Sequence, residues 1–435
     1  MTGPGIPYTA DAPRGHGAGV SPTVRRSPFG RFVADSAAAG RLVVQPRMGF
    51  SDLARMRAGL ARTKSAAATT VGTLTIDSYT RLGEHAAARK ALAEGARLNG
   101  YPIVSHSLSS TRAVLDGLLD ESFPVQVRHG SSRPQRIVQA LTAAGLEATE
   151  GGPVSYCLPY GRTPLRESVK NWTLTCALLA GSARTPHLES FGGCMLGQLC
   201  PPGLLVAISV LEAVFFTRHG VNSVSMSYAQ QTDPAQDEEA VRALRRLATE
   251  FLPAETDWHV VLYTYMGVYP TSESGARRLL ERSAELAVRS GARRLIVKTA
   301  AEAHRIPTVG ENVRALETAA ATAAATRGTA NPHPPLDSGV YEEARAFVTA
   351  VLDLGDDLGR ALETAFRRGY LDVPFCLHPD NAGRSRSFID HAGRLRWSAV
   401  GAMPIRPSPA PSARSAMTST QLLSALHSVA RKFDQ

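Results

Sequence analysis

The chain has 435 residues, of which 43% are hydrophobic and 20% charged, a composition typical of a globular protein that can bury a sizeable core. The formal net charge is +10, but no run of Lys and Arg is interleaved with aromatic residues, which argues against nucleic-acid binding. The excess of positive charge fits either a solvated basic surface or attraction of an anionic substrate or an acidic partner.

Cysteine usage and apolar runs restrict the class further. The five cysteines are odd in number and form no C-x-x-C pair, so we expect no disulfide scaffold, no metal site and a reducing cytoplasm. The N-terminus lacks the compact apolar core of a signal peptide. The longest apolar run, "GLLVAISVLEAVFF", is short and contains Glu212, which predicts a buried helix and no membrane span.

Taken in chain order, the elements alternate. Residues 1–28 are rich in Gly, Pro, Ser and Ala and predict a disordered leader. Strands are predicted at residues 41–47, 72–77, 101–106, 124–129, 153–158, 222–228, 258–265 and 293–299. Helices are predicted at residues 51–64, 84–98, 109–120, 134–146, 163–180, 202–218, 235–251 and 272–290.

Eight strand signals, each followed by a helical pattern, predict an α/β fold, a (β/α)8 TIM barrel, over residues 29–306. A doubly wound open sheet is the alternative, but no G-x-G-x-x-G follows the first strand. The Gly- and Pro-rich stretch 187–203 is interpreted as an inserted active-site loop.

The alternating pattern of strands and helices ends after the eighth predicted strand. Residues 307–435 predict a helical and irregular C-terminal appendage: an Ala-rich helix, a helical unit at 341–369, an irregular segment at 371–415 and a last helix at about 418–432.

Three predicted strands deliver an arginine at or just beyond the carboxyl end, where barrel enzymes carry their chemistry. These are Arg47, Arg81 and Arg128. Each alone could be a surface ion-pair partner, but three in one repeating pattern favour a ligand with more than one carboxylate, because guanidinium binds carboxylate through two parallel hydrogen bonds. The seventh strand ends near Tyr263, Tyr265 and Tyr269.

Charged groups beside tyrosines add candidate catalytic functions. Glu150, close to Tyr156 and Tyr160, could pair with an ammonium group or act as a base, or it could simply pair with one of the arginines. Lys298 and Glu302 are four residues apart and could form a simple ion pair.

Six motifs resemble the large (epsilon) subunit of glutamate mutase, also called methylaspartate mutase. They are "VVQPRMGF", "LTIDSYTR", "VQVRHG", "EGGPVSYCLPY", "ESFGG…PP" and "RLIVKTAAEAHRIPT", spread in order over about residues 40–310. The resemblance implies a (β/α)8 barrel that interconverts L-glutamate and L-threo-3-methylaspartate by a radical rearrangement. It implies adenosylcobalamin as cofactor and a small cobalamin-binding subunit as partner, with two copies of this chain in a heterotetramer.

The resemblance also implies roles for individual residues. The catalytic group is Glu150, Arg128, Lys298 and Glu302. Substrate contacts are Arg47, Arg81, Arg128, His129, Glu150, Tyr156, Tyr160 and Glu189, the last within the inserted loop. Coenzyme contacts are Gly49, Asn99, Pro159, Tyr269, Lys298, Glu302 and Ile306, with Tyr269 standing where the family has Phe.

The cobalt-ligating signature D-x-H-x-x-G of cobalamin proteins is missing. Asp257, Trp258 and His259 begin like it, but the run continues as a strand, so we expect the small partner to supply the cobalt ligand. The turn at Ala229 to Gln231 departs from the family pattern. The alternatives are a related adenosylcobalamin mutase acting on another amino acid, and a non-catalytic barrel scaffold.

Overall fold

The computed structural model describes residues 24–159, 161–195, 199–329, 336–406 and 418–435. Within them, eight parallel strands form one sheet in the order β1-β8-β7-β6-β5-β4-β3-β2. The strands are β1 (Val43–Gln45), β2 (Gly72–Thr75), β3 (Val125–Arg128), β4 (Ala148–Gly151), β5 (His187–Ser190), β6 (Ser223–Ala229), β7 (Asp257–Tyr263) and β8 (Arg294–Ile296).

The sheet closes between its first two strands. A parallel bridge joins Val44 to Thr70, and the amide of Thr75 donates to the carbonyl of Met48 at 2.9 Å. The predicted (β/α)8 class is therefore confirmed, with β1, β2 and β3 as neighbours around the barrel.

Two of the eight predicted strands are wrong, and two strands of the structure were not predicted. The apolar run 101–106 forms only an isolated bridge between Tyr101 and Ile76, and residues 153–158 form turns. The true fourth and fifth strands are β4 and β5, so residues 187–190 are a strand and not part of an inserted loop. Glu189 accordingly lies on β5.

The reason for this error is the polar interior of the barrel. The Arg294 guanidinium, fully buried, donates to the side chains of Glu189 and Gln45 and to Ser225. Gln126 donates to Glu189 at 3.1 Å. Strands that face such an interior carry polar residues, as "ATEG" and "HLES" do, and show no apolar run from which a strand could be predicted.

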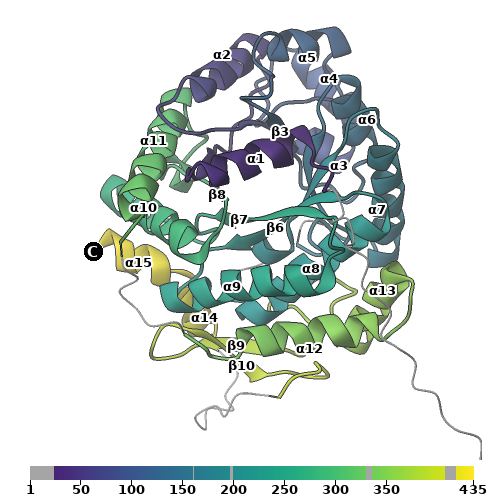
Figure 1. The fold of residues 1–435 in the computed structure, drawn as a ribbon, viewed down its shortest axis with the longest axis vertical. Coiled ribbons are helices and arrows are strands. Elements are labelled where there is room, and N and C mark those ends of the chain that lie inside the picture. The colour runs from purple at the N-terminus through teal and green to yellow at the C-terminus, as the bar shows by residue number, and fades with distance from the viewer. Residues whose placement is uncertain (1–23, 160, 196–198, 330–335, 407–417) are drawn as a thin grey trace, which may run out of the picture.

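A ring of helices surrounds the strands (Figure 1). It contains α2 (Leu53–Lys64), α4 (His85–Ala93), α5 (Leu108–Leu115), α6 (Gln135–Ala143), α7 (Leu165–Ala180), α8 (Pro202–Arg218), α9 (Pro234–Phe251), α10 (Glu273–Ser290) and α11 (Val309–Thr326). The apolar run ending at Phe216 is the buried part of α8, as predicted. Among the described residues, no helix combines the length and the apolar character that a membrane span requires.

Helix α1 (Pro28–Ala38) lies across the amino ends of the strands, in purple at the front of Figure 1. Its Phe29 stacks on His187 with ring centroids 4.9 Å apart, and the Arg294 guanidinium lies 5.1 Å from the same ring. Ser27 caps α1, so the end of the predicted leader 1–28 belongs to the fold; residues 1–23 lie outside the described part.

The C-terminal region packs on the outside of the barrel. Helix α11 lies between α10 and α2, beyond the predicted boundary at residue 306, and completes the ring. It is followed by α12 (Val340–Leu352), α13 (Leu358–Arg368), α14 (Ser419–Leu426) and α15 (Ser428–Asp434). The segment predicted as irregular contains a hairpin of β9 (Arg386–Ile389) and β10 (Leu395–Ala399). Its polar sequence did not indicate these strands.

Candidate active site

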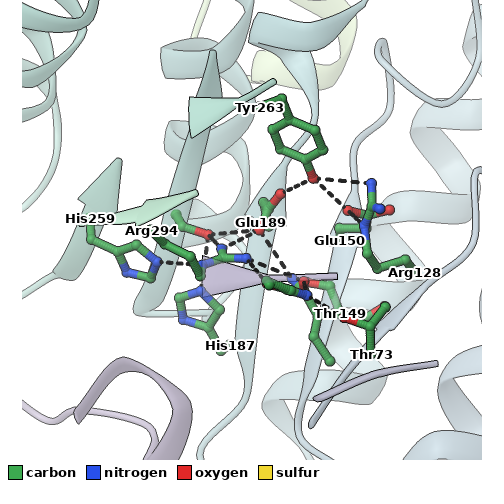
Figure 2. Close-up of polar contacts among 12 residues, drawn as sticks. Thr73, Arg128, Thr149, Glu150, His187, Glu189, His259, Tyr263 and Arg294 are labelled. Carbon is green, nitrogen blue, oxygen red and sulfur yellow. Dashed lines mark hydrogen bonds and ion pairs between the residues drawn. The ribbon is translucent and has the colours of Figure 1, made fainter. Parts of the chain in front are cut away.

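A buried group of charged side chains lies at the carboxyl ends of β3, β4, β5 and β7 (Figure 2). Arg128 Nε donates to Glu150 Oε2 at 2.8 Å, and Arg128 Nη2 lies 3.3 Å from the Tyr263 hydroxyl. The same hydroxyl lies 2.9 Å from Glu150 Oε2 and also contacts Glu189 Oε1. Two predicted site residues, Arg128 and Glu150, are thus brought together.

Two guanidinium groups balance two carboxylates in this cluster. Burial opposes the charge of Arg128, but Glu150 outweighs it, so the pKa of Arg128 is raised well above its usual value. Burial likewise disfavours ionised Glu189, but Arg294 outweighs it and lowers the pKa of Glu189. Glu189 therefore stays charged, and each guanidinium lies against one of the two carboxylates.

Tyr156 reaches the cluster from the turn that follows β4. Its hydroxyl donates to Glu150 Oε1. The turn is fastened by Glu212 on α8, which accepts from the amides of Val154 and Ser155 at 3.0 and 2.8 Å. Burial raises the pKa of Glu212 to about 7. Tyr160, another predicted substrate contact, lies outside the described residues.

His129 follows Arg128 but faces the other way. Strand alternation turns its ring toward α7, where it stacks on Trp172 with centroids 5.9 Å apart and meets Tyr156 edge-on. Burial lowers the pKa of His129 to about 3, so the ring is neutral. Its Nδ1 accepts from the amide of Ser131, and its buried Nε2 has no hydrogen bond in the described part of the chain.

The other two arginines lie near the carboxyl ends of β2, which pairs with β3, and of β1, which follows β2 around the barrel. Arg81 is on the short helix α3 (Ser78–Leu82) after β2, and its stem lies over Gly130, where a Cβ would stand 3.2 Å from Arg81 Cδ. Arg47 is two residues beyond β1 and forms a 2.6 Å ion pair with Glu302. The three arginines thus follow three neighbouring strands, an arrangement that suits a ligand with several negative charges.

Lys298 and Glu302 follow β8 and do not pair with each other as their spacing had suggested. The Glu302 carboxylate holds Arg47, and its Oε1 accepts from the amide of Thr299 at 3.2 Å. The Lys298 ammonium lies 4.1 Å from the centre of the Tyr269 ring and donates to the Tyr265 carbonyl at 3.3 Å. Burial lowers the pKa of Lys298 to about 8.

The remaining predicted coenzyme contacts lie around the same end of the barrel. Close packing explains why residue 49 is a glycine, since a Cβ at Gly49 would stand 2.0 Å from the Thr75 carbonyl oxygen. Asn99 is exposed and its side chain bonds to Ser78 at the start of α3. Pro159 is half-buried, and Ile306 is exposed.

Two residues of the cluster were not predicted as site residues. Tyr263 stands at a predicted strand end, which was the available signal, but its sequence neighbours indicate no role. Arg294 is the second residue of the predicted strand 293–299 and reaches the cluster only through the barrel interior. Conversely, Asp257 and His259 lie on β7 as predicted; His259 is buried against His187, with centroids 5.1 Å apart, in the barrel interior.

The cluster is suited to binding and proton exchange in a water-poor site. It offers cationic donors for carboxylates, a carboxylate for an ammonium group, and phenols that restrict how these groups move. Glu150 is 2% exposed, so a ligand that reached it would be largely removed from water.

The sequence matches the family model described as Methylaspartate mutase E chain (MutE) over residues 25–420. It is 32% identical to the glutamate mutase epsilon subunit of Escherichia coli O157:H7 over 352 residues, covering 76% of this chain and 72% of the relative. It is 30% identical to that of Yersinia enterocolitica, covering 87% and 81%. The crystal structure of tryptophan synthase subunit alpha from Legionella pneumophila aligns at a TM-score of 0.39 and 12% identity, covering 69% of this chain and 100% of that one.

Proposed function

The chain belongs to the methylaspartate mutase E chain family, and on this basis we propose that it is the catalytic large subunit of an adenosylcobalamin-dependent glutamate mutase. The reaction is the reversible rearrangement of L-glutamate to L-threo-3-methylaspartate. The observation that carries the substrate assignment is the buried Arg128–Glu150 pair, with Arg81 and Arg47 near the neighbouring strand ends.

The charges match an amino diacid. L-Glutamate brings two carboxylates and one ammonium group, and the site offers three guanidinium groups and the Glu150 carboxylate. Within the described part of the chain, Nη1 of Arg128 makes no hydrogen bond, so this group is free to donate to a substrate carboxylate while Nε keeps Glu150. Glu150 then holds the substrate ammonium and accepts its proton.

The residues after β8 fit the adenosyl part of the coenzyme. The buried Tyr269 hydroxyl has no hydrogen-bond partner among the described residues, and the buried Lys298 ammonium lies over its ring. Lys298 and Glu302 suit ribose hydroxyls, and Ile306 and Tyr269 offer apolar surface. When bound, the coenzyme supplies the organic radical that takes a hydrogen atom from the substrate.

The protein itself holds the substrate in place and shields it from water. The arginines fix both carboxylates while the carbon skeleton rearranges, and the barrel and a partner over its mouth exclude water. We propose that a small cobalamin-binding subunit is this partner and supplies the cobalt ligand, that two copies of this chain form a heterotetramer with it, and that the complex works in the cytoplasm. The five buried free cysteines suit a reducing compartment.

Reconstitution tests the proposal. The purified chain, a small cobalamin-binding subunit and adenosylcobalamin are mixed with L-glutamate, and methylaspartate is measured by proton NMR. We expect product only when all components are present. Turnover without cobalamin, or no turnover of L-glutamate with rapid turnover of another amino acid, would contradict it. Glutarate serves as the control ligand, because it has the two carboxylates of glutamate but lacks the ammonium group that Glu150 is proposed to bind.

A further inference from the structure

The Tyr263 hydroxyl has one hydrogen but two carboxylate oxygens within reach. It lies 2.9 Å from Glu150 Oε2 and in contact with Glu189 Oε1, while Arg128 Nη2 stands 3.3 Å away as a donor to the phenol oxygen (Figure 2). A phenol that donates to one carboxylate presents only lone pairs to the other. The hydroxyl therefore has two alternative orientations.

Each orientation suits one protonation state of Glu150. With Glu150 ionised, Tyr263 donates to it. With Glu150 protonated, the carboxyl donates to the phenol oxygen, and the Tyr263 hydrogen turns to Glu189. Glu189 can accept that hydrogen because Arg294 and Gln126 both bind its other oxygen, Oε2, and leave Oε1 for Tyr263.

Resting on the proposed function, we propose that Tyr263 is a positioning residue for Glu150, whose hydroxyl rotates between Glu150 and Glu189 as Glu150 takes up and returns the substrate ammonium proton. The proton moves only between the ammonium nitrogen and a Glu150 oxygen. The tyrosine keeps its hydrogen and changes its acceptor, so that Glu150 retains a hydrogen bond in both states.

The other groups around Tyr263 do not offer a competing proton. The charged and titratable side chains facing it are Arg128 on β3, Glu150 on β4, Glu189 on β5 and Cys194 on the 3-10 helix η1 (Gly192–Cys194), with Arg294 behind Glu189 and Tyr156 behind Glu150. Burial raises the pKa of both Tyr263 and Cys194 well above their usual values, so both stay protonated.

Two substitutions test the rotation because their effects oppose each other. Tyr263→Phe removes a donor from ionised Glu150 and an acceptor from protonated Glu150; the bond to the charged form is the stronger, so the ionised form loses more. In Glu189→Gln, the amide oxygen faces Arg294 and the NH2 group faces Tyr263, which turns the hydroxyl permanently toward ionised Glu150.

The first measurement is the infrared band of protonated Glu150 in the full chain, titrated with pH and assigned by its loss in Glu150→Gln. We expect the midpoint to move up by about one pH unit in Tyr263→Phe and down by a similar amount in Glu189→Gln. Tyr228→Phe is the matched control, since Tyr228 is a buried tyrosine on β6 whose hydroxyl donates to Asp237 outside the cluster.

The second measurement is the pH profile of kcat/KM in the reconstituted complex. The acid limb should move in the same two directions, and kcat of Tyr263→Phe should fall roughly tenfold with little change in KM. Unmoved midpoints in both variants overturn the inference. So does an upward shift in Tyr263→Phe without a downward one in Glu189→Gln, because that describes a one-way donor.

The proposed function and the role of Tyr263 can be refuted independently of each other. The infrared titration needs no turnover, so it decides the role of Tyr263 even if L-glutamate is not the substrate. If Glu189→Gln does not fold, an unchanged midpoint in Tyr263→Phe still overturns the inference by itself. A wild-type complex that leaves L-glutamate unchanged refutes the proposed function and not the rotation.

Discussion

Replacing Arg128 by Lys keeps a positive charge but removes the planar fork. In the free protein the guanidinium uses Nε for Glu150 at 2.8 Å and Nη2 for Tyr263 at 3.3 Å, and lies over the Tyr263 ring at 5.2 Å. A lysine ammonium has one nitrogen, so it cannot donate to Glu150 and to a substrate carboxylate from two separate positions, as Nε and Nη1 of Arg128 can.

The magnitude follows from the lost contacts. A hydrogen bond to a charged group contributes about 1.5 to 3 kcal/mol, and the retained charge of Lys recovers part of the loss. One such bond lost, with partial loss of the weaker contact to Tyr263, gives about 2 to 3 kcal/mol and lowers kcat/KM roughly 30- to 150-fold. Because Arg128 is 5% exposed, water does not replace the missing donor.

The assay is steady-state turnover of L-glutamate by the reconstituted complex, with thermal unfolding of each variant as a check of folding. Arg133→Lys is the matched control, because Arg133 pairs with Glu167 at 2.7 Å but both side chains are largely exposed. We expect that control to stay within twofold of wild type. An unchanged KM and kcat for Arg128→Lys would refute the need for two separate donor nitrogens.

Three further predictions concern the supports of the site. The pKa of Glu212 is raised by burial from 4.5 to about 7, so the folded state binds its proton more tightly than the unfolded state and stability falls as pH rises through this window; relative to Glu212→Gln, wild type should lose about 3 kcal/mol between pH 4.5 and 7 in urea unfolding, and a pH-independent difference would contradict this. Gly193→Ala should cost more than about 3 kcal/mol, since its Cβ would stand 1.7 Å from the Ser227 carbonyl oxygen, whereas Gly117→Ala, at φ 68° with no atom within 4 Å, should cost about 1 to 2 kcal/mol; equal melting temperatures would count against the clash. The pKa of Lys298 is lowered by burial to about 8, so kcat/KM should decline above that pH as the ammonium is lost, and Lys298→Arg should abolish this alkaline limb; a limb that persists assigns it to another group.

The sequence by itself determined the fold class and supplied most residues of the candidate site. Helical periodicity located most of the ring, because these helices have one apolar face toward the strands, and α8, which is buried on all sides, was located from its continuous apolar run. The arginines were found because a charged residue at the end of an apolar strand is unusual. In the structure β1, β2 and β3 are neighbours around the barrel, so the three strand ends lie side by side, and the shared role of the arginines stays a prediction.

Only the tertiary structure decided which segments are strands four and five and what completes the charged cluster. Local patterns assume an apolar interior, and in this barrel the interior is a hydrogen-bonded polar network. Arg294 and Glu189 are 105 residues apart in the chain, and Tyr263 and Glu150 are 113 apart. Spacing along the sequence does not predict such pairs, because a buried charge is tolerated only when the fold brings its distant partner into contact with it.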